Sequence, residues 1–363
     1  MNTFGRTIGL TIFGESHGLS IGAVLDGLPS GEAIDWDAVR AEMARRAPGK
    51  NKMSTARSEK DAFEVQSGFF NGHTTGTPLC AIIRNSDQHS RDYDQLRHIM
   101  RPGHADYSGK IRYGGFNDYR GGGHFSGRLT APLVFAGAVA SQILARHGIT
   151  IGSHILRLAG IADKPFDAAG ATAETLQALK KETLPVLDKA QAGPMEEKIL
   201  EAKNDLDSVG GVIECMVTGL PAGIGDPFFD SVESQLSHMM FSVPAVKGIE
   251  FGDGFALADL RGSQANDAFY YDGDVVKTRT NHNGGINGGI TNGMPVVFRL
   301  AVKPTASISQ KQETIDTDTK ENCDLVIKGR HDPCIVQRAI PVVEAAAAWA
   351  ILDVCLSEKG RCW

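Results

Sequence analysis

The sequence has 363 residues, a length that suits one large domain or two ordinary ones. Apolar residues make up 42% and charged residues 22%, which is the balance of a soluble globular protein. The net charge of −6 removes the electrostatic argument for binding nucleic acid or an anionic membrane, so any basic cluster has to be local.

The first distinctive stretch is Phe13-Gly-Glu-Ser-His-Gly18, which ends a strand predicted over residues 7–13 from its β-branched and aromatic content. Its pattern Gly-x-Ser16-x-Gly matches the nucleophile elbow of serine hydrolases, which requires a helix after the turn. Residues 19–26 are rich in β-formers and broken by glycine, and this argues against a hydrolase. A tight turn with a capping serine and a surface histidine (His17) is the structural alternative.

An internal repeat organises the rest of the chain. Residues 24–31 recur as residues 216–223, and each copy is predicted as a strand that ends in a proline-glycine turn. A helix pattern follows each copy, with Asp35 and Asp230 as the predicted N-caps. In the first half, the remaining expected elements are strands at 65–70 and 75–83 and a final alanine-rich helix at 130–145. In the second half they are strands at 248–251 and 291–300 and a final alanine-rich helix at 339–356.

This order predicts an α+β fold, built as two related halves with antiparallel sheets covered by helices. The halves span about 7–147 and 208–357 of a single domain over 1–363, with a peripheral helical insertion at about 160–207. Glu344 and Asp353 interrupt the longest apolar stretch, so we expect a buried core helix there and not a membrane span. The six cysteines form no C-x-x-C pair, so we expect no metal site. No apolar signal segment opens the sequence, so we expect a cytoplasmic protein.

Basic residues gather beside glycine or proline in five places. These are Arg45-Arg46 with Lys50, Lys52 and Arg57; Arg101-Pro-Gly-His-Ala-Asp106; Arg120-Gly-Gly-Gly-His-Phe-Ser-Gly-Arg128; Lys303-Pro-Thr-Ala-Ser307; and Lys328-Gly-Arg-His-Asp-Pro-Cys334. Backbone amides at a helix start and flanking arginines together form anion sites. Histidines near them can exchange protons at neutral pH. The Rossmann and P-loop fingerprints are both missing. The residues therefore predict an enzyme that acts on a phosphorylated polyanion, with the cofactor left open.

Taken together, these motifs resemble the chorismate synthase family over almost the whole chain and in the same order. The resemblance implies a β-α-β sandwich that assembles as a homotetramer. It also implies the anti-1,4 elimination of phosphate from 5-enolpyruvylshikimate 3-phosphate to give chorismate, with reduced FMN and no net redox change. The resemblance leaves two sources of the reducing equivalents open, namely NADPH used by the protein itself and an external flavin reductase as a partner.

The resemblance also implies roles for individual residues. His17 matches the histidine that protonates the departing phosphate, and His104 the one that protonates the reduced flavin. Ser16 and Ser126 match relay serines, and Asp332 matches an aspartate thought to help deprotonate flavin N5. The residues that fall where the family binds flavin are His124, Phe125, Ser126, Ala245, Gly288, Lys303, Pro304, Thr305, Ala306, Ser307 and Arg330. Those that fall where it binds substrate anions are Arg46, Lys52, Arg57, Arg101 and Arg128, with Arg330 contributing to both.

The sequence departs from the family pattern at three places. His124-Phe125 replaces a more polar pair, Pro244 replaces an asparagine beside the flavin, and Lys52 stands where arginine is frequent. Two other functions remain open at this point, a flavin-dependent oxidoreductase and a non-catalytic polyanion-binding protein. Consumption of reduced nicotinamide in proportion to product would favour the oxidoreductase.

Overall fold

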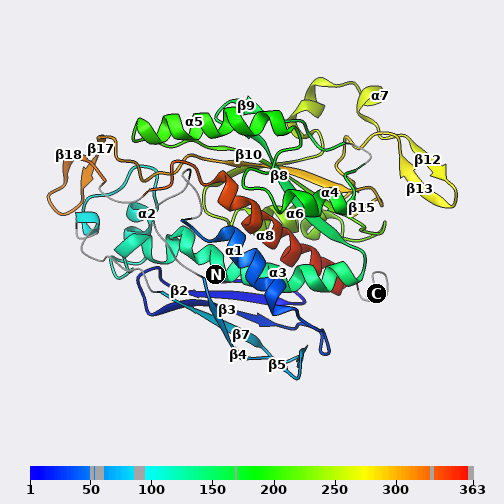
Figure 1. The fold of residues 1–363 in the computed structure, drawn as a ribbon, viewed down its shortest axis with the longest axis horizontal. Coiled ribbons are helices and arrows are strands. Elements are labelled where there is room, and N and C mark those ends of the chain that lie inside the picture. The colour runs from blue at the N-terminus through cyan, green and yellow to red at the C-terminus, as the bar shows by residue number, and fades with distance from the viewer. Residues whose placement is uncertain (50–52, 54–60, 86–94, 168–169, 328–330, 359–363) are drawn as a thin grey trace.

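The computed structural model of the chain describes residues 1–49, 53, 61–85, 95–167, 170–327 and 331–358. Two five-stranded antiparallel sheets enclose a layer of helices, as Figure 1 shows with the first sheet below and the second above. The predicted α+β sandwich is therefore confirmed. Its core lies between the layers, where the largest fully buried side chains include Trp349, Phe135 and Phe298.

The first sheet has the strand order β1-β2-β3-β7-β4. Its strands are β1 (Thr3–Phe4), β2 (Gly9–Gly14), β3 (Ser20–Asp26), β4 (Phe63–Ser67) and β7 (Leu79–Arg84). The helices that follow its strands along the chain are α1 (Trp36–Arg46) and α3 (Thr130–Arg146). The predicted strand over 65–70 is broken, because the register with β7 shifts between Val65 and Ser67 before β5 (Phe69–Phe70) begins.

The second sheet has the strand order β11-β16-β10-β8-β9. Its strands are β8 (Thr150–Leu158), β9 (Ile161–Ala162), β10 (Gly211–Thr218), β11 (Val246–Phe251) and β16 (Val296–Val302). The helices of this half that face the other layer are α6 (Val232–Met240) and α8 (Val336–Ser357). The strand β8 pairs with β10 in an antiparallel manner, as β2 pairs with β3 in the first sheet. The division into two related halves stays a prediction.

The segment between β8 and β10 contains α4 (Ala173–Leu179) and α5 (Ala192–Asn204). Helix α4 contacts β8 on the outer face of the second sheet, and α5 lies at the top of Figure 1. Leu176 and Leu179 of α4 pack there against Met216 of β10 and Val297 of β16. The segment predicted to be peripheral is helical and serves as the outer cover of this sheet.

One of the two predicted caps is correct. The Asp35 carboxylate accepts hydrogen bonds from the N–H groups of residues 37 and 38, as an N-cap does. The prediction for Asp230 is wrong, because Ser231 caps α6 by accepting from the N–H of Ser234. Asp230 instead ends a short 3₁₀ turn, and its carboxylate pairs with Arg6 at 2.7 Å.

In the part of the chain that the structure describes, two helix-containing segments, Gly127–Arg146 and Val336–Ser357, are long and apolar enough to span a membrane. The most apolar window of the first is 78% buried inside the protein, and that of the second is 100% buried. In α8 the Asp353 carboxylate accepts hydrogen bonds from the N–H groups of Arg6, Thr7 and Ile8. The prediction of a core helix at this position is therefore confirmed.

Shorter elements complete the fold and place the loops that matter below. They are α2 (Asp106–Arg112), α7 (Gly262–Ala265), β6 (His73–Thr74), β12 (Phe269–Asp272), β13 (Val275–Thr278), β14 (Ile286–Asn287), β15 (Ile290–Thr291), β17 (Gln312–Asp316) and β18 (Glu321–Leu325). The β17–β18 hairpin lies beside α2 at one end of the sandwich, on the left of Figure 1.

Candidate active site

A cavity of about 890 Å³ collects loops from distant parts of the chain. Most of the site residues predicted from the sequence line this cavity. They are Arg46, Arg101, His104, His124, Phe125, Ser126, Arg128, Ala245, Lys303, Pro304, Thr305, Ala306, Ser307 and Asp332. The charged side chains in its lining, within the described part of the chain, are six cations and the single carboxylate of Asp332. The cations are Arg46, Arg101, Arg128, Lys247, Lys303 and Arg338. This imbalance makes the cavity suited to a polyanion.

The glycine loop after Arg120 brings the two predicted proton donors, His17 and His104, to one place. Gly121 lies so close to His17 that a Cβ atom on it would stand 2.2 Å from His17 Cε1. A Cβ atom on Gly122 would stand 3.1 Å from His104 Cε1. Both glycines have φ in the left-handed region, at +59° and +86°. Only glycine permits this approach, and the two imidazoles therefore contact neighbouring residues of the same loop.

Ser16 and His17 lie under this loop and are buried. The Ser16 hydroxyl is 3.0 Å from His17 Nδ1, and the Ser16 N–H donates to the carbonyl of Gly123 at 3.1 Å. Gly121, not His17 itself, lines the cavity. The serine and histidine of the N-terminal motif are thus buried behind the loop, and the surface histidine of the alternative interpretation is wrong.

A second cluster holds His104. The Asp106 carboxylate binds Arg101 through Nε and Nη2, both at 2.7 Å, and lies 2.6 Å from His104 Nδ1. Burial would raise the pKa of Asp106, but hydrogen bonds from Arg101 and His104 outweigh it and hold this pKa well below its usual range. Arg101 Nη1 also donates to Ser307 at 3.2 Å, which joins this turn to the segment 303–307.

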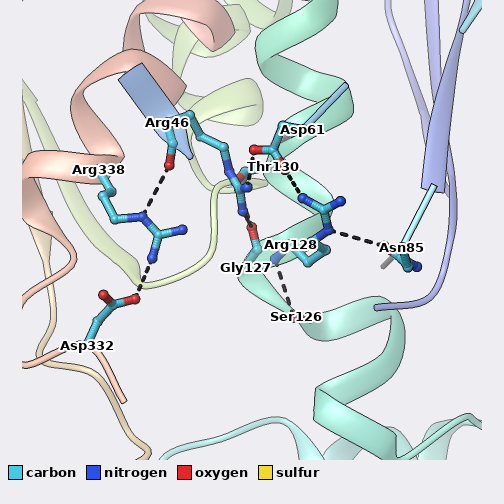
Figure 2. A network of polar contacts seen from close by, with 9 residues as sticks. All are labelled: Arg46, Asp61, Asn85, Ser126, Gly127, Arg128, Thr130, Asp332 and Arg338. Atoms are coloured by element: carbon cyan, nitrogen blue, oxygen red, sulfur yellow. Dashed lines mark hydrogen bonds and ion pairs between the residues drawn. The ribbon is translucent and has the colours of Figure 1, made fainter. Parts of the chain in front are cut away.

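Two of the arginines share one carboxylate, as Figure 2 shows. Arg46 Nη1 donates to Asp61 at 2.7 Å, and Arg128 Nη1 donates to the other oxygen of the same group. Arg46 also donates to Thr130 Oγ1 at 3.1 Å and to the Gly127 carbonyl at 2.9 Å. Burial would raise the pKa of Asp61, yet the two guanidinium groups keep it below its ordinary value. The pair of cations keeps a net positive charge at the cavity wall.

Arg338 belongs to the same wall, and the sequence interpretation missed it. Its guanidinium donates to the Asp332 carboxylate and, at 3.2 Å, to the Arg46 carbonyl (Figure 2). Burial lowers its pKa. Arg338 lies in the first turn of α8, where the helix dipole disfavours a cation. That unfavourable position is a signal in the sequence that could have identified it.

The residues predicted to bind flavin form another part of the lining. His124 Nδ1 donates to the Gly14 carbonyl at 2.8 Å, and the Phe125 ring packs on Gly109 of α2. Ala245 has φ of +72°, an uncommon conformation for alanine that marks a constrained site. Pro244 lines the cavity beside it.

The cavity wall also contains polar atoms whose hydrogen-bonding capacity is unused. Thr305 Oγ1 and His331 Nε2 are buried and have no hydrogen-bond partner within the described part of the chain. Lys303 Nζ donates to the Gly103 carbonyl and so joins two loops of the cavity wall. Unsatisfied buried polar groups are uncommon in native proteins. Here they fit a site whose remaining partners belong to a bound molecule.

The other predicted residues lie elsewhere. Gly288 is in the turn between β14 and β15 and does not line this cavity. Lys52, Arg57 and Arg330 fall outside the described residues.

The chain is similar to known proteins over nearly its whole length. The family model described as chorismate synthase matches residues 8–356. The chain is 46% identical to a chorismate synthase of Chitinophaga pinensis, over 99% of this chain and 98% of the relative. It is 44% identical to one of Dehalococcoides mccartyi, over 98% and 96%. A crystal structure of chorismate synthase superposes with a TM-score of 0.76 at 29% identity, covering 98% of this chain and 94% of that one.

Proposed function

The chain belongs to the chorismate synthase family, and we propose that its cationic cavity is where the substrate of that family lies against reduced FMN. The protein is a carbon–oxygen lyase of the shikimate pathway. It eliminates phosphate from 5-enolpyruvylshikimate 3-phosphate to give chorismate, a precursor in aromatic biosynthesis.

The charge of the cavity carries this proposal. The substrate has a phosphate and two carboxylates, and six cations against one carboxylate line the cavity within the described residues. Arginine binds planar and tetrahedral oxyanions through paired N–H groups. Arg46, Arg101 and Arg128 are therefore proposed to hold the three acidic groups, together with Arg338.

The segments proposed to hold the flavin fit a flat ligand with polar edges. The Phe125 ring and Ala245 offer apolar surface, and Lys303 offers a cation for the FMN phosphate. The unused Thr305 hydroxyl and His331 Nε2 offer hydrogen bonds. We propose this set, with His124 and the segment 303–307, as the FMN contacts. Arg330 and Gly288 join the proposal on the family resemblance alone.

When bound, reduced FMN would supply the electron that allows the phosphate to leave, with no net redox change over the whole reaction. His17 is proposed to hold the proton that the departing phosphate takes, with Ser16 as its hydrogen-bonded neighbour at 3.0 Å. His104 is proposed to hold a proton at Nε2 on the flavin side. Asp332, oriented by Arg338, offers the carboxylate that accepts a proton, and Ser126 relays it.

Other assignments are proposed on the resemblance to the family. The chain assembles as a homotetramer in the cytoplasm. NADPH, directly or through an external flavin reductase, provides the reducing equivalents. Lys52 and Arg57 are proposed to bind substrate anions.

Release of phosphate tests the function directly. Purified protein is mixed anaerobically with the enolpyruvyl substrate, FMN and dithionite, and inorganic phosphate is measured. We expect catalytic release with reduced FMN and none with oxidised FMN alone. Release no faster than in a control with reduced flavin and no protein would refute the proposal.

A further inference from the structure

The turn over residues 101–106 closes on the carboxylate of Asp106, the first residue of α2. Its Oδ1 lies 2.6 Å from His104 Nδ1 and 2.7 Å from Arg101 Nη2. Its Oδ2 lies 2.7 Å from Arg101 Nε and 3.1 Å from the Arg101 backbone N. The side chain is only 7% exposed and does not line the cavity. Asp106 therefore contacts two residues of the proposed site from behind.

The hydrogen on His104 can be placed from these contacts. Nδ1 is 3.0 Å from Arg101 Nη2 and 2.6 Å from Asp106 Oδ1, and a ring nitrogen cannot accept from one and donate to the other at once. Arginine only donates, and an ionised carboxylate only accepts. The lowered pKa of Asp106 keeps it ionised at neutral pH, so Nδ1 carries a hydrogen and donates it to Asp106. The approach of Arg101 Nη2 is then a contact and not a hydrogen bond.

The other ring nitrogen is thereby left for the cavity. A Cβ atom on Gly122 would stand 3.3 Å from His104 Nε2, so this nitrogen faces the glycine loop that also covers His17. His104 itself lines the cavity. With Nδ1 committed to Asp106, Nε2 is the atom that gains or loses a proton.

The turn is held in place by the β17–β18 hairpin. The Met100 N–H donates to the Ile315 carbonyl at 3.2 Å, and the Thr314 hydroxyl donates to the Met100 carbonyl. Lys110 of α2 donates to Thr317 Oγ1 at 2.6 Å, so both ends of the turn are fixed to the same hairpin. Because the backbone is fixed on both sides, a change at Asp106 acts on the side chains it holds.

We propose that Asp106 is a positioning residue of the reaction, which fixes the Nδ1–H tautomer of His104 and the orientation of the Arg101 guanidinium. This inference rests on the roles proposed above for His104 and Arg101. It assigns Asp106 no contact with substrate or flavin, and no bond to it is made or broken.

The tautomer can be measured in the unaltered FMN-bound protein. Histidine labelled with ¹³C and ¹⁵N is incorporated, and the His104 signal is identified by its loss in His104→Asn. We expect neutral His104 to carry its hydrogen on Nδ1. A hydrogen on Nε2 would overturn the proposal, whatever the variants do.

The Asp106→Asn variant tests the consequence for turnover. Its amide can donate or accept, so we expect a mixed tautomer, and turnover lower by about 10²-fold from the lost orientation. Asp353→Asn is the matched control, since Asp353 is a buried carboxylate that does not line the cavity and accepts three backbone hydrogen bonds. The control should lower stability without changing the His104 tautomer or the turnover of the folded enzyme. An Asp106→Asn variant that behaves like this control would refute the proposal.

The two levels of inference fail in different ways. If the unaltered protein releases no phosphate, the proposed function fails, while the tautomer result still decides where the hydrogen lies. If phosphate is released and His104→Asn turns over normally, the function stands and the positioning role of Asp106 is overturned.

Discussion

Replacing Gly121 with alanine tests whether the glycine loop sets the position of His17. The added Cβ would lie 2.2 Å from His17 Cε1, 2.3 Å from Nδ1 and 2.9 Å from Ser16 Oγ. Ordinary carbon contacts begin near ~3.5 Å, so the imidazole has to move by roughly 1 Å. Misplacement of a reacting group by about 1 Å can lower the rate about 10²-fold. We therefore expect Gly121→Ala to lower turnover by about two orders of magnitude.

The backbone makes a separate contribution that a control can isolate. Alanine at the φ of +59° found at Gly121 costs about 1 kcal/mol in any surroundings. Gly148 has a similar φ of +75°, and among the described residues no atom lies within 4 Å of the place where its Cβ would stand. Gly148→Ala therefore carries only the backbone cost. Urea unfolding should show a loss of about 1 kcal/mol for Gly148→Ala and a loss at least as large for Gly121→Ala.

Anaerobic phosphate release then separates the two variants. Gly148→Ala is expected to keep the turnover of the unaltered enzyme, because its site lies at the end of α3 and outside the cavity. Turnover of Gly121→Ala within about twofold of Gly148→Ala would contradict the argument. It would mean that His17 tolerates a displaced ring or takes no part in the reaction.

Three further predictions concern other residues. His17→Ala and His104→Ala should each lower phosphate release strongly while far-ultraviolet circular dichroism stays unchanged; near-normal rates in both would remove the proton-donor roles. Burial would lower the pKa of His154, but hydrogen bonds to two carboxylates raise it above the ordinary 6.5. The charged His154 therefore stabilises the fold fully below about pH 6.5, and this stabilisation is lost as the pH rises through the raised pKa. The free energy of unfolding in urea should accordingly differ most between the unaltered protein and His154→Gln below about pH 6.5, and the difference should shrink as the pH rises. In the core, the Glu344 carboxylate accepts hydrogen bonds from the Ser153 N–H and from the Arg45 guanidinium, so Glu344→Gln should lower the free energy of unfolding by about 3 kcal/mol in the same assay. A loss under about 1 kcal/mol would show that the Arg45–Glu344 ion pair is not needed for stability.

The regular elements could be predicted from the sequence because their signals are local. The alanine-rich pattern before Arg146 and the apolar stretch around Trp349 each produced the long helix that was expected. The cap at Asp35 was also visible, since a capping carboxylate needs only the next few N–H groups. The error at Asp230 has a local cause too, because Asp230 and Ser231 are adjacent and both are residue types that cap helices. Asp230 is the last residue of a 3₁₀ turn, so α6 begins one residue later and Ser231 caps it.

The acids that anchor the cations could not be predicted in the same way. Asp61 lies 67 residues from Arg128 in the sequence, and no spacing rule links them. Arg338 is close to Asp332 in the chain, but its second contact is a backbone carbonyl at Arg46, 292 residues away. Partnerships of this kind depend on how loops meet after folding. The sequence could therefore indicate the cations of the site but not what holds them.

The structure suggests a physical reason why arginine, rather than lysine, fills these positions. An unpaired buried cation is costly, so each guanidinium needs a resident partner before the substrate arrives. Arg46 spends three of its five N–H groups on Asp61, Thr130 and the Gly127 carbonyl among the described residues. The remaining donors of the same rigid group can bind an oxyanion without breaking those bonds. A lysine has only three donors, so holding the same three partners would leave none for the substrate. Anchored arginines thus present fixed donors to the incoming charge, and little reorganisation accompanies binding.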